Sequence, residues 1–98
     1  MKIITVCGSL KFQQEMMRAA ETLSLQGNCV LSVVYPASPQ KIYTQAEKEM
    51  LGAMHKERIK LSDAVYIVNV EGYIGEQTKS EIAFAKALGK EILYLCAQ

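Results

Sequence analysis

Apolar and polar positions divide the chain into four short apolar runs, separated by longer segments of helical periodicity. The runs cover residues 3–7, 29–34, 64–70 and 91–96, and they are rich in β-branched and other apolar side chains. Runs of this length, bounded by glycine, proline or polar residues, are typical of strands buried on both faces of a sheet. The pattern therefore predicts four strands.

The segments between these runs each predict one helix. The first helix has Ser9 as its simplest N-cap and ends at Gly27, a residue suited to a left-handed cap. The second begins at a capping box at Thr44 and contains Gly52, which we expect to bend or split it. The third covers residues 78–88.

Alternation of strands and helices favours right-handed crossovers and a parallel sheet with helices on both faces. We expect residues 1–98 to form a single α/β domain with a three-layer architecture. Its four-stranded parallel sheet should have the order 2-1-3-4, as in flavodoxin-like and Rossmann-like folds. The glycine spacings of a dinucleotide fingerprint and of a P-loop are both absent from the sequence.

Two loops fall at the carboxyl edge of this sheet, where ligands bind in open α/β folds. One is Gly8-Ser9 after the first strand, and the other is the glycine-containing segment 71–77 after the third. Both lead into helices, whose N-terminal N–H groups favour an anion. The sequence therefore predicts a site for an anion or a sugar hydroxyl at this edge.

Glu81 has two interpretations. Thr78 and Glu81 match the spacing of a capping box, in which Thr78 caps the third helix and Glu81 returns a hydrogen bond to its N–H. Alternatively, Glu81 is a nucleophile, or it stabilises a cation that develops during a reaction. The two roles are partly compatible, because a carboxylate has two oxygen atoms.

The segment Gly75-Glu76-Gln77-Thr78-Lys79-Ser80-Glu81-Ile82-Ala83-Phe84-Ala85 resembles the glycine-rich loop and helix start of the nucleoside 2-deoxyribosyltransferase superfamily. That superfamily includes deoxynucleoside-monophosphate N-glycosidases. The resemblance extends to Cys7-Gly8-Ser9, Ser62-Asp63 and Ala87-Leu88-Gly89-Lys90. It implies that Glu81 is the nucleophile. The chain departs from the family at Ala83, where a glycine is usual, and at His55, which replaces an aspartate.

The resemblance and the predicted fold together give a set of expected site residues. A second catalytic group would be His55 or Glu76, and the sequence does not choose between them. His55 should lie part-way along the sheet, since eight helical residues rise about 12 Å while a strand of six residues runs about 20 Å. It would then reach the ligand only if its helix were tilted or broken at Gly52. The expected ligand-binding residues are Cys7, Gly8, Ser9, Phe12, Tyr35, Asn69, Gly72, Tyr73, Gly75 and Thr78.

Composition narrows the classes of partner. The formal net charge is +1 with no basic patch, which argues against binding to nucleic acid, and no apolar run is long enough to span a membrane. The three cysteines lack the spacing of a zinc site and fit buried thiols in a reducing cytoplasm. We expect no metal and no cofactor.

Three functions follow as hypotheses. The first is cleavage or exchange of an N-glycosidic bond in a nucleoside or nucleoside monophosphate. The second is a nucleotide-binding or nucleotide-sensing module without catalysis, and the third is an interaction domain with no ligand. A homodimer or larger assembly is expected, because the family's fifth strand is missing and Met17, Met50 and Met54 are candidates for an exposed surface.

Overall fold

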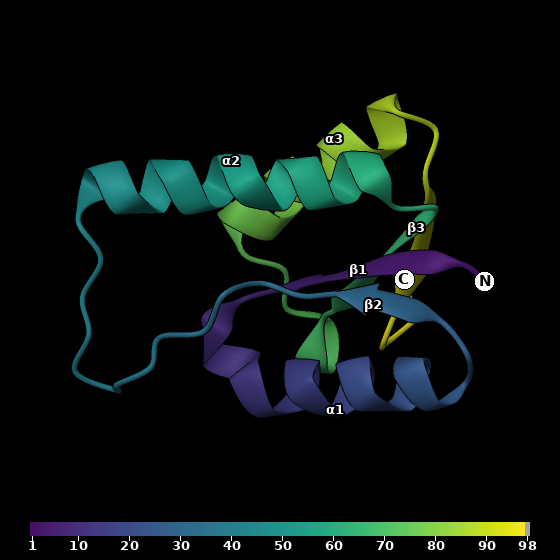
Figure 1. Cartoon of the computed structure of the whole chain (residues 1–98), viewed down its shortest axis with the longest axis horizontal. Coiled ribbons are helices and arrows are strands. Elements are labelled where there is room, and N and C mark those ends of the chain that lie inside the picture. Colours follow the sequence, from purple (N-terminus) through teal and green to yellow (C-terminus); the bar gives the residue numbers. More distant parts are fainter. Residues whose placement is uncertain (98) are drawn as a thin grey trace.

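A four-stranded, all-parallel sheet lies at the centre of the computed structural model, which describes residues 1–97 (Figure 1). The strands are β1 (Ile3–Gly8), β2 (Cys29–Leu31), β3 (Ala64–Val68) and β4 (Glu91–Tyr94), and they lie in the order β2-β1-β3-β4. The α/β class, the parallel pairing and the strand order predicted from the sequence are confirmed.

Helices cover both faces of the sheet and give three layers. Helix α1 (Gln13–Leu25) lies on one face, and α2 (Gln45–Leu61) and α3 (Glu76–Ala87) lie on the other (Figure 1). Short 3₁₀ turns, η1 (Leu10–Phe12) and η2 (Val70–Gly72), follow β1 and β3. Both turns lie at the carboxyl edge of the sheet, where the ligand loops were expected.

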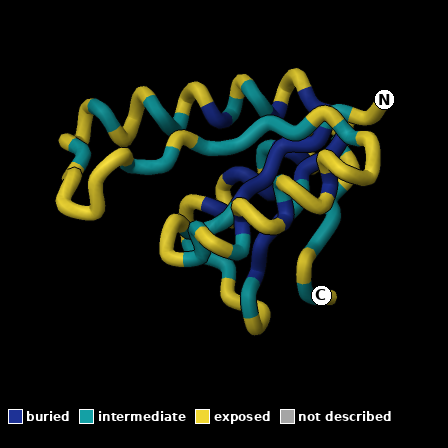
Figure 2. Tube along the Cα trace, turned by 60° about the horizontal axis from the view of Figure 1, so that its bottom comes forward, coloured by how far each residue is buried: buried dark blue, intermediate teal, exposed yellow. Residues whose placement is uncertain are grey.

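Alternation along β1 divides the core into two parts. Ile4 and Val6 pack in the cluster on the side of α1, whereas Cys7 packs in the cluster that includes Ile59 of α2 and Ile82 of α3. The central strands are the most buried part of the chain (Figure 2). Cys7 is therefore fixed in the layer between the sheet and the two helices of one face.

Three strands end earlier than the apolar runs predicted. The edge strand β2 stops at Leu31 because only three of its residues pair with β1, so residues 32–34 lie in the loop that follows. Strand β3 stops at Val68, and the chain then forms the turn η2. Strand β4 stops at Tyr94. Apolar side chains continue into these loops because the loops still pack against the core.

The predicted start of the third helix is wrong, and so is the capping box at Thr78. The N-cap of α3 is Gly75, and Lys79 N–H donates to the Gly75 carbonyl at 2.9 Å to close the first helical turn. Glycine is accepted at an N-cap, so the helix begins at Glu76, two residues before the threonine. Thr78 lies inside the helix, and Glu81 is free of any capping role.

Helix α2 also differs from its prediction. The capping box at Thr44 is confirmed, since Thr44 exchanges hydrogen bonds with Glu47 at 2.8 and 3.1 Å. The expected bend or break at Gly52 is not present within the described residues, because α2 runs unbroken through that position. No helix in the described part of the chain combines the length and apolarity needed to cross a membrane.

Candidate functional site

A cavity of about 300 Å³ opens at the carboxyl end of β1, between the loop after β2 and helices α2 and α3. Its apolar wall includes Leu10, Val33 and Leu51. Its polar wall is formed by Tyr43, Lys48, His55, Arg58, Gln77 and Glu81, with the backbone of Gly8 beside them. This is the combination of an apolar pocket and a few converging polar groups that small-molecule sites have.

A second cavity, of about 420 Å³, lies between α1 and the carboxyl side of β3 and β4. Although it is larger, its charged lining residues Glu15 and Arg18 come from the outer part of α1, and none of its lining residues is a buried acid or base. We therefore assign the candidate site to the smaller cavity.

Glu81 lies in the second turn of α3 and is only 5% exposed. Gln77, one helical turn earlier, donates from Nε2 to Glu81 Oε2 at 3.4 Å. Burial raises the pKa of the Glu81 carboxyl above its usual 4.5, while hydrogen bonds from Gln77 and Cys7 act in the opposite direction. Glu81 is thus a buried carboxyl group that borders the cavity and has its orientation fixed.

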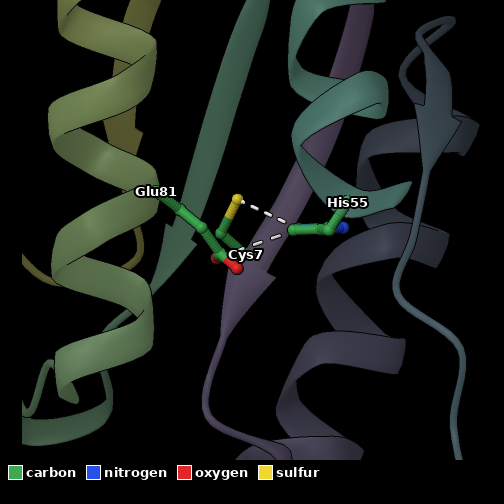
Figure 3. Close-up of side chains that lie close together, drawn as sticks. All are labelled: Cys7, His55 and Glu81. Atoms are coloured by element: carbon green, nitrogen blue, oxygen red, sulfur yellow. Dashed lines mark hydrogen bonds and ion pairs between the residues drawn. The ribbon is translucent and has the colours of Figure 1, made fainter. Parts of the chain in front are cut away.

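His55 comes from the facing helix α2 and is 3% exposed. Its Nε2 lies 3.4 Å from Cys7 Sγ and 3.9 Å from Glu81 Oε1. Dashed lines in Figure 3 mark these two contacts. Burial, followed by the positive charge of Arg58, lowers the pKa of His55 from 6.5 to about 4. The imidazole is therefore neutral at pH 7 and forms no charged pair with the carboxylate.

Cys7 completes this cluster from β1, near the carboxyl end of that strand (Figure 3). Burial, together with the neighbouring carboxylate of Glu81, raises the pKa of the Cys7 thiol well above its usual 9.0. A thiol in this state is a poor nucleophile, because the reactive form is the thiolate. The contact between Cys7 and His55 is therefore not a cysteine–histidine catalytic pair.

The structure separates the two candidates for a second catalytic group. His55 lies beside Glu81 and borders the cavity. Glu76 is at the first position of α3 with its side chain 92% exposed, and it pairs there with Lys79 at 3.1 Å. Within the described residues, His55 is thus the candidate that accompanies Glu81, although α2 is not broken at Gly52.

Several expected ligand-binding residues form a separate group, and none of its members is among the residues that line the cavity. Phe12 and Tyr73 contact each other edge-to-face with 5.7 Å between ring centroids, and Lys11 Nζ lies 3.4 Å from the centre of the Tyr73 ring. The backbone of Gly75 approaches the Tyr73 hydroxyl, which a β-carbon on Gly75 would meet at 3.5 Å. Ser9 caps the turn η1 by accepting from Lys11 N–H at 3.3 Å.

The remaining expected residues have structural contacts elsewhere. The Asn69 amide is fully buried and exchanges two hydrogen bonds, of 2.8 and 2.9 Å, with the backbone of Cys96. Thr78 is buried within α3, and the Tyr35 hydroxyl accepts from Ser32 at 3.3 Å beside the core on the side of α1. Gly72 has a φ of 82°, a backbone conformation that glycine adopts without strain.

Two residues that contact the central cluster were missed by the sequence analysis, namely Arg58 and Gln77. Their spacing was a usable signal: Arg58 follows His55 by three residues, and Gln77 precedes Glu81 by four. Residues at these separations are neighbours on one face of a helix. Their spacing therefore predicts Arg58 as a partner of His55 and Gln77 as a partner of Glu81.

Cys7, His55 and Glu81 offer three ligand atoms that all lie within 4.8 Å of one another. Figure 3 shows that the three side chains converge from β1, α2 and α3.

Comparison with known proteins identified no relatives of this chain, since it matches no protein-family model and no curated protein sequence.

Proposed function

We propose that the protein cleaves or exchanges the N-glycosidic bond of a nucleoside, a deoxynucleoside or the corresponding monophosphate, with Glu81 as the nucleophile. The observation that carries this proposal is a buried carboxyl group at the wall of a cavity that a small ligand can enter. The sequence resemblance at the start of α3 supports the same role for this residue.

In the proposed reaction, the bond between C1′ of the sugar and the base nitrogen breaks, and its electron pair leaves with the base. Glu81 then forms a bond to C1′, as the nucleophile does in retaining glycoside hydrolysis. Water or a second base displaces the carboxylate and regenerates it. Gln77 holds Oε2 of Glu81, which leaves Oε1 on the side of His55.

His55 acts in this proposal by hydrogen bonding and not as an acid. With its pKa at about 4, a protonated imidazole is scarce at pH 7, so the departing base takes its proton from solvent water. Tyr43 lines the cavity and is suited to stacking on the base. Lys48, on the same helix as His55, lines the cavity two turns away and would favour an anionic substituent.

A second candidate function is nucleotide binding without turnover. Glu81 is the only carboxylate among the cavity-lining residues in the described part of the chain. Glycosidases commonly use two carboxyl groups, so a lone carboxylate favours a binding module.

We further propose a cytoplasmic protein that acts as a homodimer or larger assembly. Only Cys7 is buried as expected, whereas Cys29 is exposed and Cys96 is partly exposed. All three are free thiols, which suits a reducing compartment. Met17, Met50 and Met54 are exposed, as expected for residues that pack in an interface. Light scattering that shows a monomer at high micromolar concentration would contradict the proposed assembly.

The test incubates the pure protein with nucleosides and with their 5′-monophosphates, and chromatography measures the free base that is released. Glu81→Gln should reduce base release by about a hundredfold or more, the scale seen when an electrostatic catalytic group is removed. Glu76→Gln is the matched control, because it removes the same charge from an exposed position on the same helix.

Each outcome distinguishes the hypotheses. No base release from the wild-type protein would refute catalysis, and saturable binding of a nucleotide by calorimetry would then support the binding module. If Glu81→Gln released base at the full rate and Glu76→Gln released none, the nucleophile would be Glu76 and the assignment of this role to Glu81 would be wrong. Thermal unfolding of both variants shows whether the fold is retained.

A further inference from the structure

The contact between Arg58 and His55 fixes which ring nitrogen of the histidine carries a proton. Arg58 Nη1 lies 3.2 Å from His55 Nδ1. A guanidinium group can only donate, so Nδ1 must accept and cannot carry a hydrogen. Since His55 is neutral, its proton is on Nε2, the nitrogen that faces Cys7 and Glu81.

The position of Arg58 is held by its backbone. Its carbonyl oxygen accepts hydrogen bonds from the hydroxyl of Thr5 at 3.1 Å and from the hydroxyl of Ser62 at 2.8 Å. Both contacts involve the main chain, so a substitution of the side chain leaves them in place. The Arg58 side chain is thus presented to His55 from a fixed point of α2.

This proton position gives direction to the whole cluster. Nε2–H of His55 faces the sulfur of Cys7 at 3.4 Å, and the sulfur accepts this hydrogen in competition with the backbone of Val6. The thiol hydrogen of Cys7 is then available to the Glu81 carboxylate, and hydrogen bonding between these two groups affects both. The donors therefore run in one direction, from Arg58 through His55 and Cys7 to Glu81.

We propose that Arg58 is a positioning residue: it fixes the His55 tautomer, directs the hydrogen bonds of the cluster to Glu81, and thereby keeps divalent metal ions out of a site with three potential ligands. The spacing of the ligand atoms would otherwise suit a metal. Sulfur and nitrogen ligands of tetrahedral zinc lie about 3.5 Å apart, close to the 3.4 Å between Cys7 and His55.

Metal binding needs a lone pair on His55 Nε2, and Arg58 opposes it in two ways. Metal-bound histidine carries its hydrogen on the other nitrogen, where a carboxylate or carbonyl group usually accepts it. In this protein that hydrogen would point at the donors of Arg58. The guanidinium charge would also repel the metal ion.

The test uses the fact that His55 is the only histidine in the chain. The ¹⁵N NMR shifts of its ring, measured at pH 7.5 in the wild-type protein, report directly which nitrogen is protonated. We expect a protonated Nε2 and an unprotonated Nδ1. A protonated Nδ1 in the wild-type protein would overturn the proposal without the need for any variant.

Two variants test the cause. Arg58→Lys retains a donor and should keep the wild-type tautomer. Arg58→Glu places an acceptor at Nδ1 and should move the proton there, which frees Nε2. Competition with a chromophoric chelator should then show zinc binding at least tenfold tighter than in the wild type.

Arg18→Glu is the matched control, because it makes the same charge reversal on the exposed side of α1 and should leave both readouts unchanged. Zinc binding by the wild-type protein as tight as that of Arg58→Glu would overturn the proposal. Neither readout measures base release, so the inference and the proposed function can fail independently.

Discussion

The neutral state of His55 makes a quantitative prediction about acid stability. His55 is buried against Cys7 of β1, Glu81 of α3 and Arg58 of its own helix, and its folded-state pKa is about 4 instead of 6.5. In the unfolded chain it takes up a proton near pH 6.5, whereas the folded protein takes it up only near pH 4. Stability is therefore lost as the pH falls through this window.

The magnitude follows from the size of the shift. A difference of about 2.5 between the two pKa values corresponds to about 3 kcal/mol of unfolding free energy, at 1.36 kcal/mol for each unit. This contribution is fully present above pH 7 and is almost fully lost at pH 4. For a domain of this size, 3 kcal/mol is a large fraction of a typical total stability.

The assay is urea unfolding of the wild-type protein and of His55→Gln at pH 7.5 and at pH 4. Glutamine has an amide oxygen that can accept from Arg58 and an amide nitrogen that can donate to Cys7, but it does not titrate. The wild type should lose about 3 kcal/mol more than the variant between the two pH values.

Glu81 titrates in part of the same range with the opposite sign. Because its folded-state pKa is raised, its contribution to stability is present at low pH and is lost as the pH rises. Both proteins in the comparison retain Glu81, so the part of its contribution that does not depend on His55 cancels in the difference. Equal losses of stability in the wild type and in His55→Gln would refute the conclusion that His55 is buried in its neutral form.

Further substitutions test other contacts, and urea unfolding measures all of them except Gly52→Leu, for which base release is measured. Gly52→Ala should stabilise α2 by about 1 kcal/mol, because the new β-carbon would lie 3.6 Å from Gln77 Nε2, an ordinary contact; no stabilisation would contradict this. Gly52→Leu should instead displace Gln77 and reduce base release. Asn69→Ala should destabilise by about 1–3 kcal/mol, because the Cys96 backbone loses both partners; an unchanged midpoint would show that the pair is unimportant. Thr44→Ala should lower the free energy of unfolding by about 1 kcal/mol, because it removes the N-cap of α2. We expect Asn69→Ala to lose at least as much stability as Thr44→Ala, and a smaller loss would contradict this expectation.

The fold could be predicted because burial on both faces leaves a strong pattern. β1 and β3 are apolar at almost every position, and glycine residues mark the ends of α1 and α3: Gly27 and Gly89 both have positive φ values. The end of β2 could not be predicted in the same way. The end of an edge strand is set by how far it pairs with its neighbour, here β1. Pairing depends on both segments and therefore cannot be inferred from the apolar run of one of them.

One misplaced helix start accounts for most of what was missed at the site. With Thr78 as the N-cap, Glu81 would lie in the first turn, at the edge of the sheet. Because Gly75 is the N-cap, Glu81 lies three residues deeper in the helix than predicted, which is about 4.5 Å further along the helix axis. That displacement brings Glu81 down to the level of His55, so the two side chains meet part-way along the sheet without any break in α2.

The surroundings of Glu81 relate the destabilising effect of its buried carboxylate to its proposed catalytic role. The other members of the core on this face are mostly apolar, including Ile59, Val65 and Ile82. An ionised carboxylate in such a layer destabilises the fold unless hydrogen bonds compensate for the lost water. Here the immediate donors, Gln77 and Cys7, are both neutral, and they offset only part of the effect of burial on the pKa of Glu81.

Packing alone would be better satisfied by an apolar side chain of similar volume. What distinguishes the position of Glu81 is that the carboxyl group also borders the cavity. A carboxylate with few stabilising contacts of its own gains most when a positive charge develops next to it, as it does on a sugar ring that loses its base. Hydrogen bonds from Gln77 and Cys7 compensate only in part for the burial of the Glu81 carboxylate. This incomplete compensation is therefore what connects the buried cluster with the proposed reaction.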